Sequence, residues 1–125
     1  MIFEVNDYAA LKRAVESFCG FLRDKQVPEE RVFDSRLVVN ELIGNILRHS
    51  NGKASFQGGI QDGFVEIYIR STQSTAFIPP EKTALPAEIT SEHGRGLFLV
   101  DSVSSERIVL KDGVCVKIRI VKTNG

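Results

Sequence analysis

The sequence of 125 residues lacks the features of several classes of protein. It contains no tryptophan and only two cysteines, Cys19 and Cys115, which lie far apart in apolar surroundings. Neither cysteine belongs to a Cys-x-x-Cys pair or a Cys/His cluster, so we expect neither a zinc site nor a disulfide framework. Both should be small buried hydrophobic residues.

An excess of charge of one sign is also missing. Sixteen lysines and arginines balance sixteen acidic residues, so the formal net charge is zero. Surfaces for nucleic acids or anionic membranes need a basic excess, and we expect neither partner. No apolar run approaches the roughly 20 residues that cross a bilayer, and the first residues do not resemble a signal peptide. We therefore expect a cytoplasmic protein in which residues 1–125 form one domain.

Hydrophobic periodicity and turn residues predict the order of the elements. Asn6 or Asp7 can cap the first helix, and the dipeptides Asp62-Gly63 and Asp112-Gly113 are typical of hairpin turns. The predicted strands are Ile2–Val5, Ala54–Gln61, Phe64–Arg70, Arg107–Leu110 and Val114–Val121, and the predicted helices run from about 8 to 24–26, from about 28 to 50, and over Leu97–Val103.

This order predicts an α+β fold. We expect a two-layer sandwich, with a mixed, mostly antiparallel sheet of four or five strands and three helices on one face. Val38, Leu42, Ile46 and Leu97 should be buried. Residues 72–93 show no sustained period and contain three prolines; so long a loop is functional or mobile in many domains, although a plain surface connection is also possible.

Three polar residues follow one another at intervals of four on the second predicted helix. Glu41, Asn45 and His49 fall along one ribbon beside the apolar stripe, because each step of four turns the helix by only about 40°. They should therefore be half-buried. Asn offers a carbonyl oxygen to a hard cation, and Glu offers a carboxylate ligand or a base. The alternative is that the three residues form no site. In that case Glu41 and Asn45 lie on a solvated helix face, and His49 is a histidine favoured by the dipole at the helix end.

A second pattern, Gly94-Arg95-Gly96-Leu97, stands at the start of the third predicted helix. Two glycines there let backbone amides approach an anion such as phosphate. A tight turn required only by packing is the other interpretation.

Taken in order, these motifs carry a family resemblance. Residues 40–49, Asn-Glu-Leu-Ile-Gly-Asn-Ile-Leu-Arg-His, are similar to the N box of the GHKL (Bergerat-fold) ATPase domains of gyrase, MutL and histidine kinases, and residues 94–100 are similar to their G2 box. The compact size most resembles the bacterial anti-sigma factor serine kinases. The resemblance spans nearly the whole chain.

The resemblance implies roles for particular residues. Glu41 would orient or deprotonate the attacking hydroxyl, and Asn45 would bind the Mg²⁺ that bridges the phosphates of ATP. The segment of about 72–93 would be the ATP lid. The cofactor-binding set would comprise Asn45, Arg48, His49, Gly94, Arg95, Gly96 and Leu97.

The chain departs from the family where adenine is read. The family's Asp-x-Gly-x-Gly box is replaced by residues 71–75, Ser-Thr-Gln-Ser-Thr, so Ser71 stands where an aspartate would contact the adenine amino group. In the last hairpin the family often has Thr just after a Gly, whereas here Gly113 is followed by Val114. Both adenine anchors are lost together, while the metal and phosphate elements are kept.

Three hypotheses follow. The first is an anti-sigma-factor-type regulatory protein that acts as an ATP/Mg-dependent serine/threonine kinase on an anti-anti-sigma partner. The second is a non-catalytic switch of the same fold with weak or no nucleotide binding, and the third is a scaffold whose boxes serve packing alone. The first two imply a sigma factor and its antagonist as partners, and the resemblance and the strand edges suggest a homodimer.

Overall fold

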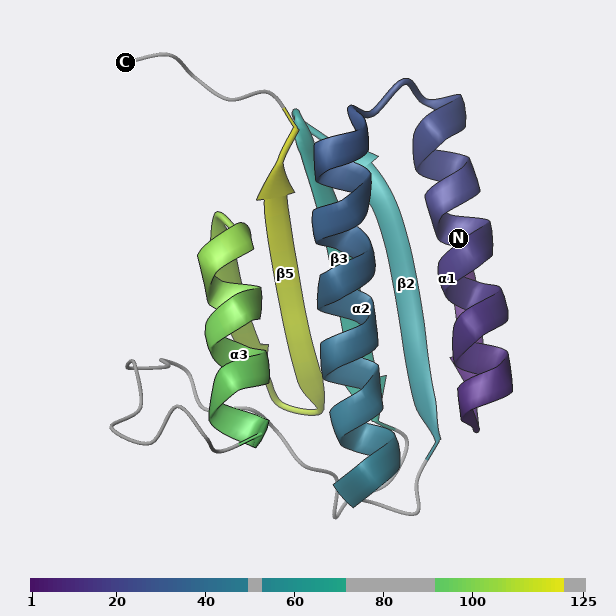
Figure 1. The fold of residues 1–125 in the computed structure, drawn as a ribbon, viewed down its shortest axis with the longest axis vertical. Coiled ribbons are helices and arrows are strands. Elements are labelled where there is room, and N and C mark those ends of the chain that lie inside the picture. The colour runs from purple at the N-terminus through teal and green to yellow at the C-terminus, as the bar shows by residue number, and fades with distance from the viewer. Residues whose placement is uncertain (50–52, 72–91, 121–125) are drawn as a thin grey trace.

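The computed structural model describes residues 1–49, 53–71 and 92–120, and these form two layers. The described elements are β1 (Ile2–Val5), α1 (Tyr8–Asp24), α2 (Glu29–His49), β2 (Ala54–Gln61), β3 (Phe64–Ser71), α3 (Glu92–Val103), β4 (Glu106–Leu110) and β5 (Gly113–Arg119). Figure 1 shows the three helices side by side over one face of the sheet. The predicted α+β sandwich and its element order are confirmed.

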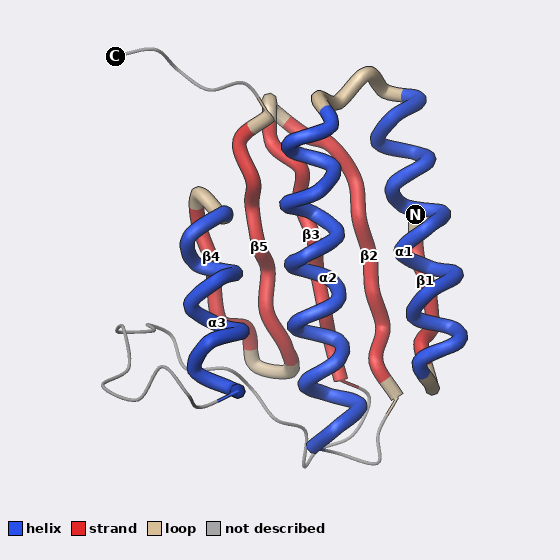
Figure 2. The backbone as a smooth tube through the Cα atoms, in the orientation of Figure 1, coloured by secondary structure: helices blue, strands red, loops and turns tan. Residues whose placement is uncertain are grey.

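The strands of the described residues form one sheet in the order β1-β2-β3-β5-β4 (Figure 2). Each of the four pairings is antiparallel. We predicted a mixed, mostly antiparallel sheet, and the described sheet contains no parallel pair. Its register places Val65, Ile67 and Ile69 of β3 toward the helices and their neighbours on the uncovered face. The alternation of hydrophobic and polar residues in the sequence therefore predicted correctly which side chains of β3 are buried.

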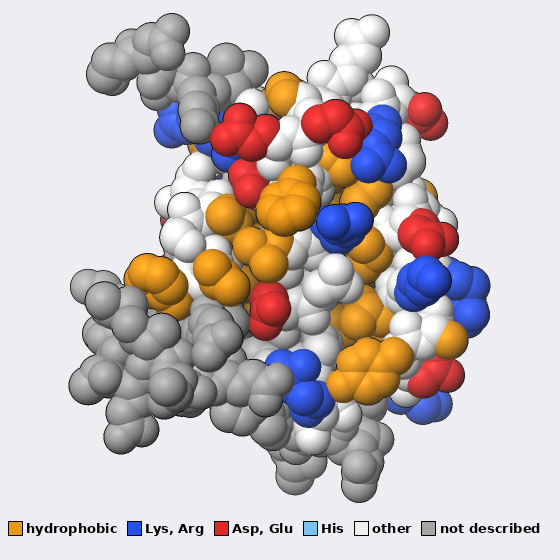
Figure 3. All heavy atoms as spheres, in the orientation of Figure 1, with side chains coloured by type: hydrophobic (Ala, Val, Ile, Leu, Met, Phe, Trp, Pro, Cys, Tyr) orange, Lys and Arg blue, Asp and Glu red, His pale blue; other side chains and the backbone are white. Residues whose placement is uncertain are grey.

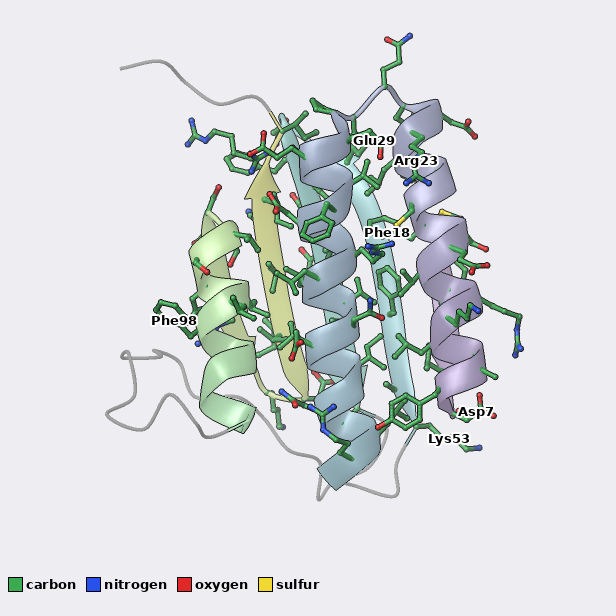
Figure 4. All side chains as sticks on the ribbon, in the orientation of Figure 1. Asp7, Phe18, Arg23, Glu29, Lys53 and Phe98 are labelled. Atoms are coloured by element: carbon green, nitrogen blue, oxygen red, sulfur yellow. The ribbon has the colours of Figure 1, made fainter. Side chains whose placement is uncertain are left out.

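The core lies between the helices and the sheet. Val38, Leu42 and Ile46 of α2 are buried as predicted, while the side chain of Leu97 lies outside the described residues. Phe18 of α1 packs edge-on against Phe56 of β2, with ring centroids 5.0 Å apart. Figure 4 shows Phe18 pointing from α1 into the space beside α2. Cys19 and Cys115 are buried free thiols, as expected.

Caps and turns explain where several elements begin and end. Asp7 caps α1 by accepting a hydrogen bond of 2.8 Å from the backbone amide of Ala10, which satisfies one of the free amides of the first turn. Asp62 and Gly63 have positive φ angles of 54° and 83°, as the predicted tight hairpin requires. The second hairpin differs, because its two-residue turn is Lys111-Asp112 and Gly113 already belongs to β5.

The third helix begins earlier than predicted. It starts at Glu92 rather than Leu97, so Gly94, Arg95 and Gly96 lie within its first turns rather than before it. The glycines suggested a turn, but glycine in a helix costs only about 1 kcal/mol relative to alanine, which packing can offset. Most of the proposed lid, residues 72–91, lies outside the described residues.

Candidate functional site

Asn45 is the most deeply buried polar side chain of the predicted site. It lies in the last third of α2 and only 1% of its surface is exposed. Its side-chain oxygen Oδ1 accepts a hydrogen bond from Nη2 of Arg48, one turn further along the helix. Its Nδ2 group is buried and has no hydrogen-bond partner among the described residues. A buried amide donor without an acceptor is costly, so this position is suited to contact a ligand or a water molecule.

Glu41 lies one helical turn before Asn45 and is half-buried, as its place at the edge of the apolar stripe predicted. Within the described part of the chain, no hydrogen bond or ion pair of its carboxylate is seen. A carboxylate in this setting can accept a proton or bind a cation. The side chain of His49, the third member of the ribbon, lies outside the described residues, so its predicted role stays a prediction.

The two positions at which the family resemblance would place adenine anchors meet in one small cavity. Ser71 ends β3 and Gly113 begins β5, and the Ser71 amide donates a hydrogen bond of 3.0 Å to the Asp112 carbonyl oxygen. The cavity measures about 10 Å³, and its lining residues are Leu42, Ile46, Ile69, Ser71, Asp112, Gly113 and Val114. Such a volume holds about one water molecule.

The strand that begins at Gly113 passes close to β3. A Cβ atom added at Gly113 would lie 2.0 Å from the Ile69 carbonyl oxygen, so this position requires a glycine. Ile69 and Val114 add apolar atoms to the lining. At about 10 Å³ the cavity between these residues is much smaller than an adenine ring.

Asp112 is a cavity residue that sequence reasoning did not select. The sequence marks it only as a residue of the turn in the last hairpin, because the family's adenine-reading carboxylate is expected at the end of β3. Its carboxylate oxygen Oδ1 lies 3.6 Å from Nε of Arg70. The pairing of Arg70 with Gly113 across β3 and β5 would have signalled that Asp112 comes close to Ser71.

The C-terminal half of α3 is joined to the sheet by an ion pair. Asp101 accepts hydrogen bonds of 2.6 and 3.1 Å from Nε and Nη2 of Arg107 in β4. The Arg107 side chain is only 3% exposed, and Val100 is fully buried. The ion pair holds the C-terminal half of α3 against β4, and α3 also packs against α2. The side chains of the predicted phosphate-binding residues at its other end, residues 94–97, lie outside the described residues.

A larger hollow of about 450 Å³ lies on the uncovered face of the sheet. Its walls include Gln57, Glu66, Tyr68 and Arg70, and Gly59 leaves its floor open. The Tyr68 hydroxyl donates a long hydrogen bond of 3.4 Å to Glu66. The described residues place no unpartnered buried polar atom there, so Glu41 and Asn45 on the helix side form the better candidate site.

The residues present suit Mg²⁺ in donor type. Magnesium takes oxygen ligands, and in nucleotide sites it uses one or two protein groups besides phosphates and waters. Asn45 would supply one such oxygen, while the described residues contain no group of three or more His, Cys, Asp or Glu side chains that could hold a metal by themselves. Bound beside Asn45, the metal would take further ligands from phosphate oxygens and waters.

A comparison with protein families matches residues 5–122 to the histidine kinase-like ATPase domain. The chain belongs to this family. No curated protein matches the chain significantly. Among the helices that the structure describes, none combines the length and hydropathy needed to cross a membrane.

Proposed function

We propose that this histidine kinase-like ATPase domain is a regulatory protein of the anti-sigma-factor type. In this proposal it acts as an ATP- and Mg²⁺-dependent serine/threonine kinase on an anti-anti-sigma protein. One observation carries the proposal: the half-buried Glu41 and the buried Asn45 lie one turn apart on α2, and neither the Glu41 carboxylate nor Asn45 Nδ2 has a partner among the described residues.

The proposed roles follow from the chemistry of these two groups. Glu41 accepts the proton of the attacking serine or threonine hydroxyl, or orients that hydroxyl. Asn45 supplies an oxygen ligand to Mg²⁺, which neutralises charge on the phosphates when it is bound. Phosphoryl transfer depends mostly on such positioning and charge stabilisation.

The proposal is tested by following transfer of the γ-phosphoryl group of labelled ATP. Each anti-anti-sigma protein encoded in the same genome serves in turn as the acceptor, with and without Mg²⁺. We expect labelling of one acceptor, and we expect Glu41→Gln to abolish it while nucleotide binding stays largely intact. Glu16→Gln, at an exposed position of α1, is the matched control and should keep full activity. Labelling that survives in Glu41→Gln would exclude Glu41 as the base.

A second candidate function is a non-catalytic switch that binds protein partners. It is supported by the cavity of about 10 Å³ at Ser71, Gly113 and Val114, which has no room for adenine. Under this function the chain binds its sigma factor and is displaced by the antagonist without phosphorylation. Calorimetric titration with ATP and Mg²⁺ separates the two, because the switch predicts no binding at millimolar nucleotide.

The partners are part of the proposal. A sigma factor and an anti-anti-sigma protein act in the cytoplasm, where we place this chain. We also propose a homodimer, because β1 and β4 are the edges of the described sheet and Ile2 of β1 is largely exposed. Exposed strand edges can pair with a second chain. Sedimentation at micromolar concentration should give twice the mass of the chain, and a monomer at all concentrations would exclude the dimer.

A further inference from the structure

Asn45 Oδ1, the oxygen proposed for Mg²⁺, already has a cationic partner. Nη2 of Arg48 donates a hydrogen bond to it. This contact fixes the orientation of the amide, because only the oxygen can accept from a guanidinium. Nδ2 therefore lies on the other side, where it is buried without a partner in the described part of the chain.

The position of Arg48 favours this contact. Arg48 lies near the C-terminal end of α2, where the helix dipole favours positive charge. Its guanidinium also lies over Gly44, and its Nη1 atom would be 3.4 Å from a Cβ atom at that position. The missing side chain of Gly44 thus leaves room beside the helix for the guanidinium next to Asn45.

We propose that Arg48 is a tethered competitor of Mg²⁺ for Asn45 Oδ1. Magnesium binds this oxygen only after the guanidinium has left it, so Arg48 sets the preference of the site for metal-bound over metal-free phosphate ligands. The inference rests on the proposed role of Asn45 as a metal ligand and adds a regulation of that same site.

Mg²⁺ and the Arg48 guanidinium cannot both bind Asn45 Oδ1 favourably at the same time. Magnesium requires near-octahedral geometry with ligands about 2.0–2.1 Å away, and a guanidinium hydrogen-bonded to the same atom would lie within a few ångströms of a divalent charge, with strong repulsion. The exchange is possible because Arg48 is exposed, so its flexible side chain can turn into water or toward a phosphate oxygen. Arginine forms such charge-assisted bonds readily.

Inorganic triphosphate is the probe, because it requires no adenine contact. The measured quantity is the magnesium preference: the dissociation constant in EDTA divided by that in saturating Mg²⁺. Arg48→Met keeps most of the side-chain length but removes the charge and the donors. A charge-assisted hydrogen bond corresponds to about tenfold in affinity or more, so the magnesium preference should rise about tenfold in Arg48→Met.

Arg36→Met is the matched control. It removes a positive charge from the same helix, but its guanidinium lies over the Phe33 ring, 5.5 Å from the centroid. Its magnesium preference should equal that of the original chain. Circular dichroism of each variant verifies that the fold is kept.

A double-mutant cycle separates competition from general electrostatics, since loss of any nearby positive charge weakens binding of metal-free triphosphate. If Arg48 competes at Asn45 Oδ1, Arg48→Met should change the magnesium preference by less than about twofold in an Asn45→Ala background. The same tenfold change in both backgrounds, or no change in either, would overturn the proposal.

Readouts without a phosphate ligand complete the test. In EDTA, the effects of Arg48→Met and Asn45→Ala on unfolding should be non-additive, and Arg48→Met should shift the side-chain amide resonances of Asn45. Additive effects and an unshifted amide would overturn the inference, as would failure of triphosphate to bind either chain with Mg²⁺. If the cycle succeeds while no acceptor protein is phosphorylated, the kinase proposal fails and this inference stands.

Discussion

At the scale of residues, two consecutive glycines of β2 meet opposite surroundings. A Cβ atom at Gly58 would lie 2.5 Å from Cε1 of the Phe18 ring, whereas one at Gly59 would meet no atom within 4 Å. The Phe18 ring is held in the core by Phe56 and cannot easily withdraw. Gly58 is therefore a requirement of packing between α1 and the sheet, and Gly59 is not.

These glycines give a matched pair of substitutions. Gly58→Ala should destabilise the protein by about 1–3 kcal/mol, because it overpacks the contact with Phe18. Gly59→Ala should be neutral or stabilise by about 0.5 kcal/mol, because it restricts the unfolded chain at a position with open space. Urea unfolding of both variants measures the difference. Equal effects would contradict the tight contact.

The two thiols give a chemical prediction. Burial raises the pKa of Cys19 and of Cys115 above the usual range, and a thiol reacts as the thiolate. Both should therefore react with a disulfide reagent at mildly alkaline pH far more slowly than in urea. Because these pKa values are higher in the folded state, the stability linked to them is complete below the unfolded pKa and is lost as the pH rises through the folded values. Rapid reaction of either thiol in the native protein would contradict its burial.

The residues of the site show what a sequence can and cannot predict. Spacing alone placed Glu41 and Asn45 on one ribbon at the edge of the apolar stripe, because helical geometry fixes that relation. It underestimated the burial of Asn45 and did not predict the contact with Arg48. That contact depends on the rotamer of a long side chain, which periodicity does not specify.

At the scale of elements, two ion pairs differ in what they join. Asp101 and Arg107 join α3 to β4, and the arginine is almost fully buried. Arg23 and Glu29 join the end of α1 to the start of α2, and both are mostly exposed; Figure 4 shows these two side chains pointing toward each other. Arg23 lowers the pKa of the Glu29 carboxyl through a hydrogen bond.

Arg107→Met should destabilise the protein by about 2–3 kcal/mol, because it leaves the partly buried Asp101 carboxylate without its charge-assisted hydrogen bonds. Arg23→Met is the control and should have little effect, since exposed ion pairs contribute little to stability. Thermal and urea unfolding of the two variants measure the contrast. A similar small loss in both would show that α3 is held by apolar contacts alone.

The limits of element prediction have local causes. The hairpin at Asp62-Gly63 was predicted correctly because its turn needs two residues that tolerate positive φ angles. The dipeptide Asp112-Gly113 gave a similar signal, yet its glycine is needed for the approach of β5 to β3. The start of α3 was misplaced because Gly94 and Gly96 resemble turn glycines in sequence, although both lie within the helix.

At the scale of the whole molecule, three segments distant in sequence meet at the cavity. The middle of α2, the end of β3 and the start of β5 come together because β3 and β5 are neighbours in the sheet beneath that helix. Figure 3 shows acidic and basic side chains interspersed on the helix side of the molecule. The sequence predicted the two layers, and the loss of both adenine anchors stays a prediction. It did not predict the small volume of the cavity, because side-chain periodicity does not specify how tightly α2, β3 and β5 pack.

Nucleotide selectivity tests this arrangement of the whole molecule. Ser71 and Val114, in a cavity of about 10 Å³, offer no carboxylate to the adenine amino group, and the mostly exposed Asp112 carboxylate beside them is paired with Arg70. Discrimination between bases requires such a placed partner. Binding should therefore depend on the triphosphate and Mg²⁺, with ATP and GTP dissociation constants within about threefold of each other. Calorimetry with ATP, GTP and inorganic triphosphate measures this directly.

Ser71→Asp restores the carboxylate and should raise the preference for ATP, provided that the cavity opens to admit the ring. A preference of about a hundredfold for ATP in the original chain would mean that Ser71, or a water molecule beside it, still recognises adenine.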